Sequence, residues 1–211
     1  MTIWHERWSA NQIGFHRAVP NDLLTKHWAA IGAAPDAHVL VPLCGKSLDM
    51  HWLVEQGHSV TGVELVETAV QAFFQEMNVK PTIETNGGIA RYAFAKNAIL
   101  QGDLFAIRPS MDPYEAWYDR AALVALPSSM RPDYVGQIHS LCAAGAVGLM
   151  ITFAYPQDQM QGPPFSLPDD EVQRLFGSRF DVELLDKIEL EDEKQRGLSS
   201  LTSSVYKLTR Q

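Results

Sequence analysis

The sequence predicts a doubly wound α/β fold, and three observations lead to that fold class. Short apolar runs rich in β-branched residues alternate with stretches of helical periodicity, which is typical of a parallel sheet covered by helices on both faces. Apolar residues make up 46% and charged residues 20% of the chain, as in soluble globular domains. The 211 residues contain no linker-like stretch. We therefore expect a single domain, residues 1–211, that buries a full core.

The first half of the chain shows the alternation most clearly. Asn21 and Asp22 are suitable N-caps for a first helix. A buried strand follows, and Gly45 comes directly after it. The predicted elements are a helix at 23–31, a strand at 38–43, a helix at 47–54, a strand at 59–65 and a helix at 67–77.

The second half continues the alternation after one interruption. Pro81 and the pair Gly87–Gly88 break the pattern within residues 80–96, which we interpret as a hairpin or a lid. Further predicted elements are strands at 98–101, 116–119 and 146–154, helices at 130–142 and 168–176, and two late strands at 180–185 and 201–208. No helix separates the late strands, so we expect a C-terminal antiparallel hairpin that closes the sheet edge. The charged stretch 189–196 would be its solvated connection.

Composition and charge disfavour several classes of function. Seventeen Lys and Arg against twenty-five Asp and Glu give a net charge of −8, which repels phosphate backbones and anionic lipids. We therefore expect no nucleic-acid partner and no membrane partner. We infer no obligate protein partner from the sequence. The N-terminus lacks the apolar core of a signal peptide. Cys44 and Cys142 are expected to be reduced thiols of a cytosolic protein, with one disulfide as the alternative. The seven histidines lack metal-ligand spacing, so we expect no metal site.

The turn after the first strand is the first candidate ligand site. In doubly wound sheets, ligands bind beyond the carboxyl ends of the strands. This turn, residues 42–47, contains one glycine, Gly45, and matches neither G-x-G-x-x-G nor the Walker pattern. Because a pyrophosphate needs several bare backbone positions, the turn disfavours both dinucleotide binding and nucleotide hydrolysis.

Two acidic residues follow the next strands and suit a nucleoside. Glu64, nineteen residues after Gly45, can accept hydrogen bonds from both hydroxyls of a ribose. The alternative is a solvated glutamate at a strand end. Asp103 can face an adenine amino group and Leu104 can pack on its ring, unless Asp103 is only a turn residue after Gly102. A nucleoside site without a phosphate cradle suits S-adenosylmethionine better than a dinucleotide.

Six segments, in order over nearly the whole chain, resemble the thiopurine S-methyltransferases. They are WHERW at 4–8, NQIGFH at 11–16, VPLCGKSLDM at 41–50, GVEL at 62–65, YDRAAL at 118–123 and GPPF at 162–165. The short stretch before Trp4 resembles the bacterial form of the family.

The resemblance implies a class I methyltransferase fold with a Rossmann-like, seven-stranded sheet and a C-terminal hairpin. It implies S-adenosylmethionine as methyl donor and an aromatic or heterocyclic thiol, such as a thiopurine, as the small-molecule acceptor. Selenium or tellurium compounds are further acceptors to consider, and a detoxifying role would follow. Carried over by position, the cofactor-binding residues are Trp4, Trp8, Leu43, Gly45, Glu64, Asp103, Leu104 and Arg120. Phe15 and Arg120 would bind the acceptor, and Arg120 would be the catalytic residue.

The expected mechanism is an in-line displacement, in which a thiolate attacks a positively charged methyl donor. Opposite charges cancel as the bond forms, so a dry site favours the reaction. We expect residues 1–20, called here the N-terminal segment, to act as a lid. Trp4 and Trp8 lie four residues apart, on one face if this segment is helical. They would approach the sulfonium or, alternatively, staple the segment to the core.

Arg120 cannot act as a base at neutral pH. It would pair with a carboxylate of the cofactor or stabilise the acceptor thiolate. Its structural alternative is an ion pair with Asp119 or another acid. No histidine or cysteine stands out as a general base.

The stretch 189–201 departs from the animal members of the family. Its nearby cations are Lys194 and Arg196, ahead of Gly197, so the resemblance assigns no acceptor contact to it. Two other functions stay open at this point: a nicotinamide-dependent oxidoreductase, and a methyltransferase-like binding module without catalysis. We expect a monomer.

Overall fold

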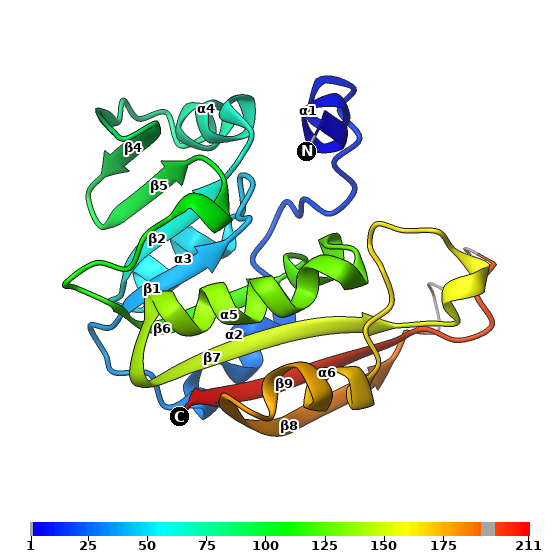
Figure 1. Cartoon of the computed structure of the whole chain (residues 1–211). Coiled ribbons are helices and arrows are strands. Elements are labelled where there is room, and N and C mark those ends of the chain that lie inside the picture. Colours follow the sequence, from blue (N-terminus) through cyan, green and yellow to red (C-terminus); the bar gives the residue numbers. More distant parts are fainter. Residues whose placement is uncertain (1, 191–196) are drawn as a thin grey trace.

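The computed structural model describes residues 2–190 and 197–211, and within them it holds one sheet of nine strands (Figure 1). The strands are β1 (His38–Pro42), β2 (Ser59–Glu64), β3 (Thr82–Asn86), β4 (Ile89–Phe94), β5 (Asn97–Gln101), β6 (Tyr114–Arg120), β7 (Cys142–Ala154), β8 (Phe180–Glu189) and β9 (Thr202–Arg210). Their order across the sheet is β3-β4-β5-β2-β1-β6-β7-β9-β8.

The helices cover both faces of the sheet, as a doubly wound fold requires. They are α1 (Thr2–Ser9), α2 (Asp22–His27), α3 (Asp49–Glu55), α4 (Glu67–Glu76), α5 (Arg131–Leu141) and α6 (Asp169–Phe176). Short 3-10 turns are η1 (Trp28–Ile31), η2 (Leu104–Ala106), η3 (Leu123–Ala125), η4 (Ser128–Met130) and η5 (Gln157–Gln159). In Figure 1, α5 and α6 lie in front of the sheet and α2 lies behind it.

The core is divided in two by the sheet. Side chains alternate between faces along a strand, and β1 shows this directly. Leu40 packs with the apolar residues of α5 and α6, whereas Val39 and Val41 pack with those of α2, α3 and α4. Both faces are therefore apolar, which explains why the buried strands were predicted as continuous apolar runs.

The central strands confirm the predicted fold class. β5, β2, β1, β6 and β7 are parallel neighbours. Parallel strands present their carboxyl ends at one edge, so the loops that begin after residues 42, 64, 101 and 120 share that edge. These loops contain most of the predicted site residues.

The expected count of seven strands is wrong for this chain. Residues 80–96, interpreted as a hairpin or a lid, form the hairpin β3–β4, which adds antiparallel to β5 and extends the sheet. The hairpin alternative is confirmed, and a lid role for this hairpin stays a prediction. Every residue of β3 is exposed, and Ile83 is 57% exposed. A strand with no buried face shows no apolar alternation, so the sequence carried little strand signal there.

The C-terminal antiparallel hairpin is confirmed by the pairing of β8 with β9. β8 runs to Glu189, beyond the predicted end at residue 185. A β-bulge lies at the predicted end, since the register shifts between Leu184 and Asp186. Such a bulge inserts one extra residue and interrupts the alternation on which the prediction depended. Of the predicted connection 189–196, residues 191–196 with Lys194 and Arg196 lie outside the described residues.

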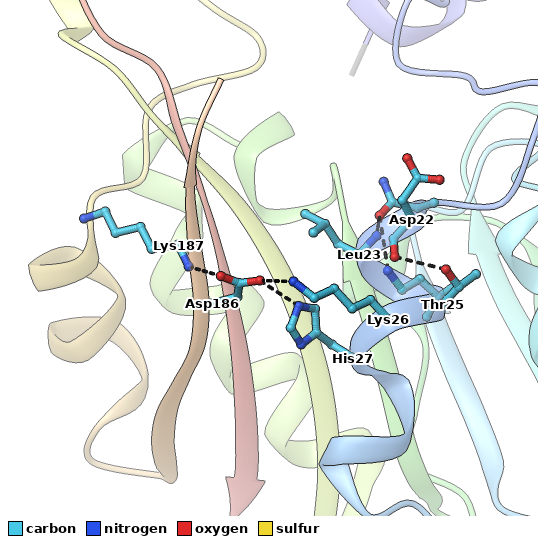
Figure 2. A network of polar contacts seen from close by, with 9 residues as sticks. Asp22, Leu23, Thr25, Lys26, His27, Asp186 and Lys187 are labelled. Carbon is cyan, nitrogen blue, oxygen red and sulfur yellow. Dashed lines mark hydrogen bonds and ion pairs between the residues drawn. The ribbon is translucent and has the colours of Figure 1, made fainter. Parts of the chain in front are cut away.

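The bulge directs Asp186 toward α2. Its Oδ2 accepts from Lys26 Nζ at 2.7 Å and is 3.0 Å from His27 Nε2 (Figure 2). This contact joins the helix that begins the fold to the strand at the far edge of the sheet.

The two cysteines and the lengths of the helices bear on two further predictions. Cys44 and Cys142 are both free and buried, which confirms the prediction of reduced thiols. Among residues 2–190 and 197–211, no helix has the length and apolarity needed to cross a bilayer.

Candidate active site

The turn after β1 has a backbone that brings aromatic rings close. Leu43 and Gly45 both have positive φ, +48° and +55°. A Cβ built on Gly45 would lie 3.3 Å from Trp8 Cζ2 and 3.8 Å from Phe15 Cε2. Glycine therefore serves this turn twice, because it accepts the left-handed conformation and leaves room for the Trp8 ring.

Cys44, between these two residues, is a packing residue. A Cβ on Gly62 of β2 would lie 2.5 Å from Cys44 Sγ, so the thiol occupies the space that the glycine leaves. Burial raises the pKa of the Cys44 thiol well above its ordinary value, and the Glu64 carboxylate raises it further. A protonated buried thiol is a poor nucleophile, so the position of Cys44 indicates packing and not catalysis.

Glu64 ends β2 with its carboxylate pointing at two backbone N–H groups. Oε2 accepts from Gly45 N at 2.8 Å and Oε1 accepts from Val66 N at 2.7 Å. The residue is only 7% exposed. Burial raises the pKa of this carboxyl, and the N–H groups of Val66 and Gly45 oppose the shift. Glu64 is thus a buried carboxylate that fixes the turns after β1 and β2 to one another, and not the solvated strand-end residue of the alternative.

Asp103 and Leu104 follow β5 and lie beside the Glu64 turn. Gly102 N donates to the Glu64 carbonyl oxygen at 2.8 Å. Asp103 Oδ1 accepts from Phe105 N at 3.0 Å and so caps η2. Leu104 is 3% exposed and belongs to the core. The structure therefore shows a capping role for Asp103 and a packing role for Leu104. Their contact with an adenine stays a prediction.

Arg120 ends β6 and holds the N-terminal segment. Its Nη2 donates to the carbonyl oxygen of Phe15 at 3.0 Å. Within the described ranges, Arg120 forms no ion pair, so the alternative of a structural pair is wrong there. Asp119 instead accepts from Tyr134 OH at 2.6 Å and from the N–H groups of Ala122 and Leu123. The Arg120 guanidinium keeps further N–H groups for a ligand.

The aromatic residues of the N-terminal segment form one cluster over this edge. Residues Thr2–Ser9 form the helix α1, so Trp4 and Trp8, four residues apart, lie on one face of it. The Phe15 ring packs edge-on against both, with centroid distances of 5.9 Å to Trp4 and 6.0 Å to Trp8. Since Trp8 also contacts Gly45, the cluster spans from α1 to the turn after β1.

A cavity of about 290 Å³ lies between α1 and the start of α4. It is lined by His5, Ser9, Val66, Glu67, Thr68 and Gln101. Its position beside Val66, two residues after Glu64, places it at the carboxyl edge of β2 and β5. Five of the six lining residues are polar, which suits a hydroxylated ligand better than an apolar one.

Sequence reasoning missed two residues in this region, His16 and Asp49. Burial lowers the pKa of His16; Lys46 and Arg120 also lower it, whereas Glu76 and Asp49 raise it. All four charged groups therefore lie near His16. Asp49 is 2% exposed and accepts from Asn21 N at 2.7 Å. Both residues stand inside motifs quoted above, but their partners are distant in sequence, so no local pattern indicated them.

No cluster of three or more possible metal ligands occurs in the described part of the chain.

Comparisons with known proteins agree on the class of protein. The family model described as thiopurine S-methyltransferase matches residues 1–211. A curated thiopurine S-methyltransferase of Shewanella piezotolerans is 44% identical over 217 residues, covering 99% of this chain and 98% of the relative. One of Pseudomonas aeruginosa is 42% identical over 213 residues, with the same coverage.

Solved structures show the same fold at low identity. A SAM-dependent methyltransferase of Methanosarcina mazei has a TM-score of 0.68 at 14% identity and covers 91% of this chain and 99% of its own. A Burkholderia thailandensis 1,6-didemethyltoxoflavin-N1-methyltransferase, solved with bound 1,6-didemethyltoxoflavin and S-adenosylhomocysteine, has a TM-score of 0.69 at 16% identity. It covers 99% of this chain and 86% of its own.

Proposed function

The chain belongs to the thiopurine S-methyltransferase family, and we propose that its donor and acceptor meet beneath the N-terminal segment, at the carboxyl ends of β1, β2 and β6. Its activity is the transfer of a methyl group from S-adenosylmethionine to the sulfur of a thiopurine. An oxidoreductase function is not favoured, because the turn after β1 has a single glycine.

The residues at the carboxyl ends of β1 and β2 fit S-adenosylmethionine. The observation that carries the proposal is the buried Glu64 carboxylate, which ends β2 beside a polar cavity of about 290 Å³. Each of its oxygens accepts one backbone N–H and keeps a lone pair for a ribose hydroxyl. Gly45 lets the Trp8 ring pack closely on the turn after β1, where that ring would cover a bound cofactor. When bound, the cofactor supplies a methyl group activated by a positively charged sulfur.

In this proposal the cofactor-binding residues are those expected from the sequence. Glu64 holds the ribose, with Asp103 and Leu104 on the adenine side. Leu43 and Gly45 would hold the methionyl part. The aromatic faces of Trp4 and Trp8 would approach the sulfonium, a cation–π contact worth ~0.5–2 kcal/mol.

The N-terminal segment would exclude water from the reacting atoms. Residues 1–20 act as the lid of one domain, and their aromatic cluster covers the turn after β1. Arg120 keeps the lid in place through the Phe15 carbonyl group at 3.0 Å. A covered site favours cancellation of opposite charges, since water would stabilise the separated charges more than the transition state.

Arg120 is the catalytic residue of the proposal, and with Phe15 it binds the acceptor. A guanidinium stays protonated at neutral pH, so it cannot remove the thiol proton. It lowers the pKa of the acceptor thiol by stabilising the thiolate, while the Phe15 ring packs on the heterocycle. A heteroaromatic thiol is acidic enough that this help suffices.

The setting of the protein is part of the same proposal. The buried free thiols of Cys44 and Cys142 support a reducing compartment, the cytosol. We take the working unit to be a monomer that acts on small thiols, or on selenium or tellurium compounds, as a detoxifying enzyme.

Calorimetry and a methylation assay test the proposal together. We expect S-adenosylmethionine and S-adenosylhomocysteine to bind the wild-type protein with measurable heat, and NAD not to bind. A panel of thiopurine, thiophenol and selenol acceptors, followed by mass spectrometry, should show methylation on sulfur or selenium. Binding of NAD in place of the sulfonium donor would contradict the proposal.

A further inference from the structure

Asp49 is a buried carboxylate for which the proposed function has no role. It is the first residue of α3, directly after the turn that contains Gly45, and is 2% exposed. Oδ1 accepts from the backbone N–H of Asn21 at 2.7 Å, and Oδ2 accepts from Tyr118 OH at 2.9 Å. A carboxylate buried this deeply persists only with such partners. The hydrogen bonds of Asp49 to Asn21 and Tyr118 therefore indicate its role.

Asn21 is the point at which the N-terminal segment joins the fold. Its side-chain oxygen accepts from Leu23 N at 2.9 Å and from Leu24 N at 3.2 Å, so it caps α2. Its own N–H goes to Asp49. Asn21 is 6% exposed and is held from both sides, which makes it a fixed base for the twenty residues before it.

A second tie holds the same segment further along. Arg120 donates to the Phe15 carbonyl oxygen, six residues before Asn21. Tyr118, the other partner of Asp49, stands two residues before Arg120 on β6. The end of β6 thus holds the N-terminal segment at two places: at its base through Tyr118 and Asp49, and at its middle through Arg120.

We propose that Asp49 is a positioning residue for methyl transfer: by holding the Asn21 N–H, it sets the base from which the N-terminal segment places Trp8 over Gly45 and Phe15 at Arg120. This inference rests on the proposed function, because it assigns the segment to the site. Without the tie, the segment samples more positions and fewer molecules have the covered site. The apparent affinity then falls in proportion to that fraction.

Three variants separate this role from simple stabilisation. Asp49→Ala removes both hydrogen bonds. Asp49→Asn keeps an oxygen for the Asn21 N–H, and its amide can donate to the Tyr118 oxygen. Tyr118→Phe is the matched control, because it removes a buried hydrogen bond of Asp49 but leaves the Asn21 contact intact.

Limited trypsin digestion measures the segment without using activity. Arg17 lies between the two ties and is the cleavage site to follow by mass spectrometry. We expect cleavage after Arg17 to be about tenfold faster in Asp49→Ala than in wild type, a factor expected for a tie that shifts the population of the covered site. Asp49→Asn and Tyr118→Phe should stay near the wild-type rate.

Kinetics then connect the segment to the reaction. Asp49→Ala should raise the KM for the acceptor and lower kcat/KM by about tenfold, since the positioned fraction enters both. Asp49→Asn should restore both values. A protein that was merely less stable, such as Tyr118→Phe, should keep the wild-type KM.

A second pair of variants decides the matter if Asp49→Ala does not fold. Asn21→Ala and Asn21→Pro both lose the cap on α2, but only the proline lacks the N–H that Asp49 accepts. Proline suits the position, because the φ of Asn21 is −69°. We expect faster cleavage after Arg17 in Asn21→Pro than in Asn21→Ala.

The outcomes are distinct from those that test the proposed function. A wild-type protein that binds no S-adenosylhomocysteine would overturn the proposed function. Equal cleavage and equal KM in Asp49→Ala, Asp49→Asn and Tyr118→Phe, or equal cleavage in the two Asn21 variants, would overturn the role of Asp49 alone.

Discussion

The carboxylates at two places in the molecule are held in opposite ways. At the candidate site, Glu64 and Asp49 are 7% and 2% exposed and accept from backbone N–H groups and a tyrosine hydroxyl. At the contact between α2 and β8, Asp186 accepts from Lys26 Nζ and contacts His27 (Figure 2). The side chains of Asp186 and Lys26 are 24% and 62% exposed.

The difference separates a rigid frame from an adaptable contact. A backbone N–H in a turn cannot swing away, and a buried carboxylate that loses such a donor is left without compensation. An exposed lysine is mobile and its attraction is screened by solvent, so pairs of this kind contribute little to stability. Mutations should therefore have large effects at the carboxyl edge of the sheet and small effects at the α2–β8 contact.

The largest effect is expected at Arg120. Arg120→Ala removes the tie to Phe15 and the cation that the proposed function places at the acceptor, so kcat/KM should fall by about 10²–10³-fold, as for loss of one transition-state donor. Arg120→Lys keeps the charge and should lose less. Steady-state methylation of a thiopurine measures both. Equal activity in the wild type and the two variants would refute the assignment.

Asp119 should couple stability at the site to pH. Burial raises the pKa of this carboxyl from 3.8 to about 6, against the hydrogen bond from Tyr134. A folded-state pKa above the unfolded value means that ionisation opposes folding at pH 7, and that this penalty disappears as the pH falls through 6 toward 4. At about 1.4 kcal/mol per pKa unit, wild type should gain at most about 3 kcal/mol relative to Asp119→Asn between pH 7 and pH 4.

Urea unfolding of both proteins across that pH range measures the difference. Because Asp119→Asn has no proton to bind at this position, contributions of the other carboxyl groups cancel in the comparison. A stability difference that does not change with pH would contradict the buried, ionised state of Asp119.

Trp8 should affect binding of the cofactor more than stability. Trp8→Ala removes an aromatic face worth ~0.5–2 kcal/mol toward a sulfonium, which is about a twofold to thirtyfold loss of affinity for S-adenosylmethionine. Trp8→Phe keeps an aromatic face and should lose less. Isothermal titration gives the affinities, and urea midpoints serve as the control. Unchanged affinity with a lower midpoint would favour the staple interpretation.

The smallest effect is expected at Asp186. The hydrogen bond from Lys26 lowers the pKa of this carboxyl below 3.8, with burial opposing and His27 assisting. The ionised Asp186 carboxylate therefore stabilises the fold above pH 3.8, the unfolded-state pKa, and this stabilisation is lost as the pH falls through the lower, folded-state pKa. Asp186→Asn should leave the urea midpoint at pH 7 and the methylation rate close to wild type. A loss as large as that of Asp49→Ala would remove the distinction between the two regions.

The sequence was sufficient for the parts of the fold that have two buried faces. β1 and β7 are largely apolar, β2 is buried at every position after its first, and the glycine after β1 marked the site turn. The hairpin β3–β4 was only one of two alternatives, because β3 buries neither face. The end of β8 was missed because a bulge at residue 185 breaks the alternation.

The site could be predicted only in part. Glu64 was found because strand ends and acidic residues have a regular spacing in this fold class. The contact of Glu64 with the Gly45 N–H, and the tie from Asp49 to Asn21, join residues 19 and 28 positions apart. Contacts of that range depend on how the chain folds back, so local patterns do not contain them.

A crystal structure of the protein with S-adenosylhomocysteine tests the central claim most directly. We predict both ribose hydroxyls within hydrogen-bonding distance of the Glu64 carboxylate, and the sulfur beside the turn 42–47 and next to the rings of Trp4 and Trp8. A nucleoside bound elsewhere, for example in the groove of about 640 Å³ between α4 and the β3–β4 hairpin, would contradict the account.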